Sequence, residues 1–305
     1  MKILVIGGSY FYGRVFVMQA TGKQESEQLE ITVVNRGTYS MAELGVQEIR
    51  GDRRDPTLWE HLSESYDVVV DFCAYAAGDI ENVLTHMPVK PHQYIYISTV
   101  DVYRRGISGY KGEDTPFEER QLPGEAGTYI AGKVALEQEV RRVCEEEKIA
   151  WTVIRPGILY GPYNYAPRES LYIRMMVQQR ILPRITDADG RFQLVYVKDA
   201  AEAVIRCLCN PQTYCKAYNI CRKEPESYAS LADVLLKVSE EDVQQLPMTA
   251  EEAEKQGVPL PFSVTAQETE LYDNTASLEE LGLRYTSLEE GMRKTYRAFR
   301  NVYCN

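Results

Sequence analysis

Tyr129 and Lys133 lie four residues apart in the segment YIAGK, which spans residues 129–133. On an α-helix this spacing puts both side chains on one face. An ammonium beside a phenol lowers the phenol pKa from about 10 toward neutral pH, so Tyr129 is predicted to act as a general acid and base. Such a pair also arises by chance, and the prediction therefore depends on the elements that carry it.

Thr99 offers a second hydroxyl group for the same chemistry. It follows a run of β-favouring residues at 93–98 and belongs to the segment YISTVDVY at 96–103. Ligands of open parallel sheets bind at the carboxyl ends of the strands. Thr99 is therefore predicted to contact the same substrate oxygen as Tyr129. The alternative is a threonine that only ends a strand.

The elements that position these residues follow the pattern of an α/β fold with a doubly wound parallel sheet. Short runs rich in Val and Ile alternate with segments of helical length, which predicts a sheet covered by helices on both faces. Apolar residues at helical spacing predict one long helix at 128–148, which carries Tyr129 and Lys133. The predicted strands span residues 3–7, 31–35, 46–52, 67–72, 93–98 and 151–156.

A glycine-rich turn, GGSYFYG, follows the first predicted strand. Glycines permit a tight turn and let backbone N–H groups approach a pyrophosphate at the start of the next helix. A turn without a ligand is the alternative. The cofactor-binding residues predicted here are Gly7, Gly8, Ser9, Tyr10, Phe11, Tyr12 and Gly13.

Asn35 and Arg36 end the second predicted strand, near the position where the adenosine ribose is recognised. An acidic residue there is usual for NAD. Asn35 does not repel a 2′-phosphate as a carboxylate would, and Arg36 can pair with one. The sequence thus predicts an NAD(P) site that favours NADP. The alternative for Arg36 is a solvated turn residue.

After residue 156 the regular alternation ends. A segment rich in Tyr, Pro and Arg spans 157–191, a strand is predicted at 192–197 and a helix from Asp199. The acidic segment 239–257 is predicted to be a helix-rich surface element. We expect residues 1–156 and about 192–222 to bind the dinucleotide, and about 157–191 and 223–305 to bind the substrate.

The charge and the cysteines restrict the class of protein. A net charge of -11 repels phosphate backbones and anionic membranes, so neither nucleic acid nor membrane is an expected partner. The seven cysteines include no Cys-x-x-Cys pair, which predicts neither a disulfide framework nor a metal site. The apolar run at the N-terminus is too short for a membrane span and lacks the small-residue cleavage site of a signal peptide, and a cytoplasmic location is expected.

Eight segments, in chain order, resemble the extended short-chain dehydrogenases, the NAD-dependent epimerase/dehydratase family. The resemblance covers about the first 220 residues. It implies a Rossmann domain that binds the dinucleotide and a smaller C-terminal part that closes over the substrate. The segments are GGSYFYG, GDRRD, DFCAY, YISTVDVY, EDTPFEE, YIAGK, IRPGILYGP and VYVKDAAEA.

This resemblance implies a role for each matching residue. Thr99 and Tyr129 match the catalytic pair, and Lys133 matches the lysine that binds the nicotinamide ribose. The long helix implies a homodimer, because relatives commonly pair through it. The other implied cofactor contacts are Asp52 and Arg53 on the adenine side, Cys73 and Ala74 in DFCAY, and Pro156 and Ile158 on the nicotinamide side.

Three positions depart from the family pattern. Tyr10 stands where the middle glycine is usual. Phe192 stands where nucleotide-sugar enzymes place an arginine for the substrate diphosphate. Val100 and Asp101 stand where sugar 4,6-dehydratases carry two acids. A nucleotide sugar is therefore a less favoured substrate, and dehydration is less expected than epimerisation or reduction.

Tyrosines gather in the segments expected to face the substrate, where their rings and hydroxyl groups suit sugars or aromatic compounds. Three functions stay open. They are a sugar or nucleotide-sugar epimerase with a retained cofactor, an NADP-dependent carbonyl reductase, and a non-catalytic dinucleotide-binding or RNA-associated scaffold, which the net charge disfavours. The predicted substrate contacts are Tyr75, Asp101, Tyr160 and Arg168, and Tyr163, Tyr165 and Tyr172 lie in the same segments.

Overall fold

A seven-stranded parallel sheet forms the centre of the protein, and its strand order is β3-β2-β1-β4-β5-β7-β11. We describe a computed structural model, in which residues 1–23, 28–62 and 64–304 are characterised. This architecture confirms the predicted Rossmann-like α/β fold. The strands are β1 (Lys2–Ile6), β2 (Glu30–Asn35), β3 (Gln47–Arg50), β4 (Val68–Asp71), β5 (Gln93–Ile97), β7 (Ala150–Pro156) and β11 (Lys216–Ile220).

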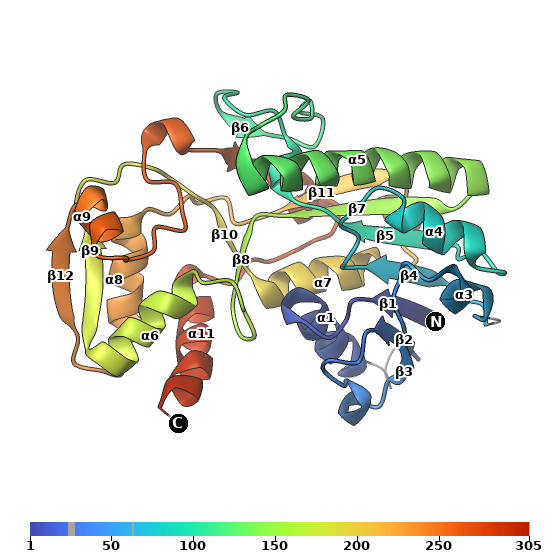
Figure 1. Cartoon of the computed structure of the whole chain (residues 1–305), viewed down its shortest axis with the longest axis horizontal. Coiled ribbons are helices and arrows are strands. Elements are labelled where there is room, and N and C mark those ends of the chain that lie inside the picture. Colours follow the sequence, from blue (N-terminus) through green and yellow to red (C-terminus); the bar gives the residue numbers. More distant parts are fainter. Residues whose placement is uncertain (24–27, 63, 305) are drawn as a thin grey trace.

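Helices cover both faces of this sheet because successive strand residues point to opposite faces. In β1, Ile3 and Val5 belong to the core cluster shared with α1 (Phe11–Thr21) and α7 (Val197–Cys207). Leu4 and Ile6 belong to the cluster on the other face. Figure 1 shows α1 and α7 below the sheet and α5 above it. The helices of the upper layer are α3 (Pro56–Glu60), α4 (Asp79–His86) and α5 (Gly124–Glu147).

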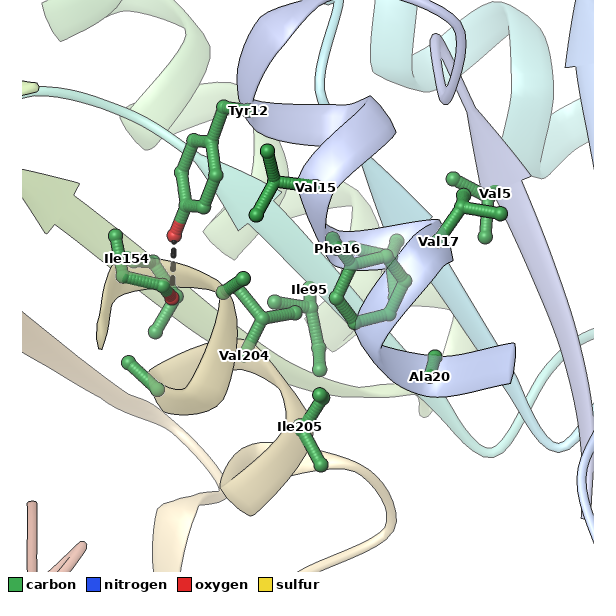
Figure 2. Close-up of a cluster of buried hydrophobic side chains, with 14 of the residues drawn as sticks. Val5, Tyr12, Val15, Phe16, Val17, Ala20, Ile95, Ile154, Val204 and Ile205 are labelled. Atoms are coloured by element: carbon green, nitrogen blue, oxygen red, sulfur yellow. Dashed lines mark hydrogen bonds between the residues drawn. The ribbon is translucent and has the colours of Figure 1, made fainter. Parts of the chain in front are cut away.

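The contact between α1 and α7 fixes the direction of the helix that follows the glycine turn. Figure 2 shows Phe16 and Val204 packed in the shared core. The buried Tyr12 hydroxyl donates to the carbonyl of Ala200 at 2.8 Å, a bond drawn in the same view. A buried phenol needs such a partner, so this bond holds the first turn of α1 in place.

A second hydrophobic core lies beside the sheet, at the left of Figure 1. It packs α6, α8 and α11 around a small parallel pair formed by β9 and β12. Two further pairs, β8 with β10 and β6 with β13, join loops of the chain. The bounds are β6 (Tyr110–Lys111), β8 (Ile158–Tyr160), α6 (Glu169–Gln179), β9 (Ile181–Ile185), β10 (Leu194–Tyr196), α8 (Tyr228–Val238), β12 (Gln244–Met248), α9 (Ala250–Lys255), β13 (Leu271–Tyr272), α10 (Thr275–Glu279) and α11 (Leu288–Tyr303).

The register of the sheet brings the carboxyl ends of the central strands together. Ile6 of β1 lies beside Val34 of β2 and Asp71 of β4, and Ile97 of β5 lies beside Ile154 of β7. The chain after β1 crosses to one side and the chain after β3 returns to the other. Such a reversal leaves a crevice at the carboxyl ends of the strands, where ligands of this fold bind.

Several boundaries differ from the sequence prediction. The predicted strand at 46–52 is only Gln47–Arg50, and the strand at 192–197 is only Leu194–Tyr196, because α7 already starts at Val197 and not at Asp199. The prediction that 239–257 is helix-rich was wrong in part. Residues Gln244–Met248 form β12, because the neighbouring strand β9 offers backbone partners, and only the short helix α9 follows.

Within the characterised residues, no helix combines the length and the apolar character that crossing a membrane requires.

Candidate active site

A cavity of about 950 Å³ opens at the carboxyl ends of the central strands. Side chains and turns from both cores line it. Most of the residues predicted from the sequence lie on its wall. They are Gly7, Ser9, Tyr10, Phe11, Tyr12, Gly13, Asn35, Arg36, Asp52, Arg53, Cys73, Tyr75, Thr99, Asp101, Tyr129, Lys133, Pro156, Ile158 and Arg168.

Three predicted site residues lie outside the wall, and Tyr160 is the clearest correction. Its ring is fully buried, 5.5 Å from the ring of Tyr196, and its hydroxyl points at Gly291 of α11. A tyrosine suits a core as well as a binding site, so the sequence did not separate the two roles. Gly8 packs against valines below the turn, and Ala74 contributes a carbonyl group to Lys133.

The Lys133 ammonium lies buried between two backbone carbonyl groups. Nζ donates to the carbonyl of Ile97 at 3.0 Å and to that of Ala74 at 3.3 Å. Ile97 is the last residue of β5, and Ala74 lies in the loop after β4, so a strand end and this loop together fix the ammonium. Burial lowers the pKa of Lys133 to about 8. An ammonium has three N–H groups, which leaves one of them for a ligand.

Tyr129 and Thr99 face each other on the cavity wall. Burial, and then the negative charge of Asp101, raise the pKa of the Tyr129 phenol to about 12, against a hydrogen bond with Thr99 that lowers it. The Thr99 hydroxyl also donates to Asp101 at 3.0 Å and accepts from its backbone N–H. The prediction that Lys133 lowers the phenol pKa is wrong, because burial and Asp101 raise this pKa. The Lys133 ammonium is bound by the two carbonyl groups and lies 5.9 Å from the ring centre.

The glycine turn brings β1 and α1 into direct contact. Gly7 has φ +86°, and a Cβ on Gly13 would lie 2.4 Å from the Gly7 carbonyl oxygen. The first turn of α1 has no acidic side chain, and no side chain of the characterised residues caps it. Its free N–H groups and the positive end of the helix dipole therefore face the cavity, which suits a phosphate anion.

Replacing Gly13 by alanine is expected to weaken dinucleotide binding about tenfold or more. The new methyl group pushes the Gly7 carbonyl away, and overpacking of this kind costs about 1–3 kcal/mol. Fluorescence titration with NADH and NADPH measures the loss. The matched control is Gly22→Ala at the other end of α1, where a Cβ meets no atom closer than 3.4 Å. Equal affinities for both variants would contradict the role of this close contact.

Asn35 is held by the protein, whereas Arg36 faces the cavity. The Asn35 amide donates to Glu48 at 3.0 Å, and its oxygen accepts from the Gly37 N–H at 2.7 Å. Hydrogen bonds from Ser40, Met41 and Asn35 outweigh desolvation and lower the pKa of the Glu48 carboxyl. The exposed Arg36 guanidinium makes no ion pair within the characterised part of the chain.

The Arg53 guanidinium lies on the cavity wall, where the resemblance implies an adenine-side contact, and it is also paired inside the protein. It lies 9% exposed and pairs with the fully buried Asp71 at 2.7 Å. It also donates to the Asp79 carbonyl at 2.7 Å. Burial raises the pKa of the neighbouring Cys73 thiol to about 11, so Cys73 is a protonated wall residue. This ion pair fixes the loop, and Asp52 beside it also lies on the cavity wall.

The cavity wall also contains residues that no sequence motif predicted. Phe262 stacks on Phe192 with ring centres 4.3 Å apart and planes at 15°. Glu270 accepts from the Gly106 N–H and pairs with Lys111. Phe262 and Glu270 come from the segment 261–272, more than 130 residues after Tyr129, and only the folded chain brings them to the cavity wall. A weak signal was Phe262 in the segment VPLPF, where it follows two prolines.

Comparisons with known proteins identify the family of this chain. The model of the NAD dependent epimerase/dehydratase family matches residues 3–221. The curated chloroplast stem-loop binding protein of 41 kDa b from Arabidopsis thaliana is 27% identical over 252 residues, which are 77% of this chain and 62% of that protein. The chain thus spans less than two thirds of this relative.

Solved structures share the fold over the whole chain. The UDP-glucose 4-epimerase of Thermotoga maritima, solved with UDP-glucose, is 19% identical with a TM-score of 0.76, covering 99% of each chain. The UDP-glucuronic acid 4-epimerase of Bacillus cereus, solved with UDP-glucuronic acid and NAD, is 20% identical with a TM-score of 0.74, covering 99% of this chain and 100% of that one. At such identities the likeness establishes the fold. The family match, which covers most of the chain, establishes that this protein belongs to the NAD-dependent epimerase/dehydratase family.

Proposed function

We propose that this protein transfers hydride between a bound dinucleotide and an alcohol or carbonyl carbon of a sugar or a related compound, and that it is an epimerase or a reductase. The observation that carries the proposal is the meeting of Tyr129, Thr99 and Lys133 on one cavity wall with the glycine turn. Strands β4 and β5, helix α5 and the turn before α1 supply these groups.

The residues present fit a dinucleotide. The first turn of α1 offers free N–H groups to a pyrophosphate, and Lys133 has one N–H left for a ribose hydroxyl. The Ser98 hydroxyl is buried on the cavity wall and has no partner within the characterised residues. A buried hydroxyl without a partner is costly, so a ligand at this point relieves it. A nicotinamide bound there would accept or donate the hydride.

In this mechanism Tyr129 moves the proton. A phenol with a pKa of about 12 is protonated at neutral pH, so Tyr129 is ready to donate to a carbonyl oxygen. Thr99 binds the same oxygen and orients it. In the opposite direction Tyr129 accepts the hydroxyl proton, which requires additional positive charge near the phenol. Arg168 on the same wall already acts in this direction on the Tyr129 pKa.

The substrate is proposed to be a sugar without a nucleotide diphosphate, or a smaller carbonyl compound. The stacked pair of Phe192 and Phe262 forms an apolar wall, and a diphosphate needs cations or N–H donors there. Tyr75, Asp101 and Arg168 are the proposed polar contacts on the substrate side. With one carboxylate after Thr99 in place of two, epimerisation or reduction is favoured over dehydration.

Replacing Arg36 by alanine is expected to weaken NADP⁺ binding about tenfold or more and to leave NAD⁺ binding unchanged. A guanidinium pairs with the 2′-phosphate, and a hydrogen bond to a charged group contributes about 1.5–3 kcal/mol. Calorimetric titration of wild type and of Arg36→Ala with NADP⁺ and with NAD⁺ measures the difference. Equal losses for the two dinucleotides would contradict an NADP preference, and firmly retained NAD⁺ in purified wild type would favour the epimerase.

One finding keeps a function of another class open. The curated relative is named a stem-loop binding protein, which makes an RNA-associated role the second candidate. The net charge of -11 opposes it, because RNA binding draws its affinity from phosphate contacts. Failure of wild type to bind either dinucleotide, together with salt-dependent binding of an RNA stem-loop, would replace the enzyme by this candidate.

A further inference from the structure

Tyr10 carries a bulky ring into the one part of the cofactor turn that is open. Glycines 7, 8 and 13 have no room for a Cβ without a shift of their neighbours. Tyr10 instead adopts an extended backbone, with φ -119° and ψ 146°, and its half-exposed ring faces the cavity mouth. Tyr10 itself is thus unstrained and its ring is available for contacts, while the next residue, Phe11, has a positive φ of 24°, so the strain of the turn falls on Phe11.

Two rings from distant segments meet Tyr10 at this mouth. Tyr39, from the loop after β2, approaches it edge-on with ring centres 5.0 Å apart. The ring centre of Tyr165, from the loop between β8 and α6, lies 6.4 Å from that of Tyr10 and 6.3 Å from that of Phe11. All three contacts have planes at 81–84°, the edge-to-face geometry that aromatic pairs favour.

The loop that carries Tyr165 is fixed at two points, so the position of the ring is not accidental. The Asn164 amide donates to both oxygens of the buried Glu169 at 2.9 and 3.0 Å. On the other side of Asn164, the Arg14 guanidinium of α1 stacks over the Tyr163 ring at 4.8 Å. The loop is thus attached both to α6 in the second core and to α1 beside the turn.

The ring of Tyr165 itself remains free to leave. It is 72% exposed and touches the turn only through ring edges. A side chain held by such contacts turns away without unfolding its loop. The two anchors thus fix the loop, and the ring of Tyr165 is its exposed part on the cavity wall.

We propose that Tyr10 and Tyr165 form an aromatic clasp across the cavity mouth that retains the dinucleotide by covering its pyrophosphate. The proposal rests on the proposed function, because it requires that the turn before α1 binds a dinucleotide. It identifies Tyr10 and Tyr165 as positioning residues outside the catalytic set. It also answers how the cofactor behaves between turnovers: the clasp keeps it bound, as an epimerase that reuses its cofactor requires.

The test is the dissociation rate of the reduced dinucleotide. NADH or NADPH, whichever wild type binds more tightly, is displaced by an excess of its oxidised form in a stopped-flow instrument, and the loss of its fluorescence is followed. Tyr165→Ala and Tyr10→Gly are each expected to raise the dissociation rate at least tenfold. The double variant is expected to release the dinucleotide at nearly the same rate as each single variant, because both rings contribute to one contact. Tyr165→Phe retains the ring edge and is expected to retain slow release.

Tyr110→Ala is the control, since it removes an exposed tyrosine, with an exposed fraction close to that of Tyr10, that does not line the cavity. Its rate is expected to equal that of wild type. Unchanged rates in Tyr165→Ala and Tyr10→Gly, with circular dichroism of the native fold and normal binding in wild type, would overturn the clasp and leave the proposed function intact. Failure of wild type to bind either dinucleotide would overturn both.

Discussion

Replacing Arg155 by methionine is expected to lower the free energy of unfolding by about 3–5 kcal/mol, because it leaves a carboxylate uncompensated in the core. Arg155 on β7 and Glu137 on α5 are both fully buried. The guanidinium binds both Glu137 oxygens, at 2.8 and 2.6 Å, and donates to the Tyr103 hydroxyl at 2.6 Å. The partly exposed Arg141, 3.5 Å from Glu137, compensates only in part. Urea denaturation measures the change.

Two controls separate this buried pair from ion pairs in general. Arg142→Met removes an exposed cation on the same helix, paired with Glu146, and is expected to leave the urea midpoint unchanged. The double variant Glu137→Leu/Arg155→Met removes both charges and is expected to recover most of the lost stability, because leucine and methionine fill the volume without desolvating a charge. A double variant as unstable as Arg155→Met would contradict this explanation.

Helix α5 was easier to predict than its first turn. The apolar spacing from Ile130 onward predicted the helix and showed that Tyr129 and Lys133 share one of its faces. The first turn, from Gly124, consists of small and polar residues with no period. It forms because Gly127 lies directly against the backbone of Leu122, and no sequence pattern expresses such a contact.

The central strands were predictable because burial on both faces leaves a continuous apolar run. Five of the six predicted strands in the first half correspond closely to β1, β2, β4, β5 and β7, whereas β3 is shorter than predicted. The seventh strand, β11, has the sequence KAYNI, which lacks such a run. It pairs with β7 at the edge of the sheet, where Asn219 is used to bind the Tyr103 hydroxyl. Strand β11 forms because it pairs with β7, and not because its own residues have a high β propensity.

For the candidate site, the motifs predicted which residues lie on the cavity wall but not their partners or pKa shifts. Sequence spacing indicated that Lys133 and Tyr129 share a face, yet the direction of the Tyr129 pKa depends on burial and on Asp101. Arg53 was assigned to the cofactor from its loop, and its partner Asp71 lies 18 residues later in β4. A sequence does not distinguish a charged side chain that pairs within the protein from one that binds a ligand.

Replacing Tyr129 by phenylalanine is expected to lower turnover by about 100-fold or more while dinucleotide affinity stays within about twofold of wild type. A positioned acid or base contributes about 10²–10⁴ in rate, and phenylalanine keeps the ring but removes the proton. The substrate is first identified with wild type on a panel of UDP-sugars, dTDP-sugars, free sugars and simple aldehydes. Absorbance of the reduced dinucleotide reports reduction, and proton NMR of the sugar reports epimerisation.

Tyr110→Phe supplies the matched control for Tyr129→Phe, because it removes the hydroxyl of an exposed tyrosine outside the cavity. Its turnover is expected to equal that of wild type. Thr99→Val, which removes the second partner of the substrate oxygen and keeps the shape, is expected to lose less than Tyr129→Phe, since it affects orientation and leaves the proton in place. Full activity of Tyr129→Phe on the identified substrate would show that another group moves the proton, and the nearest candidate on the wall is the Asp101 carboxyl, which already binds Thr99.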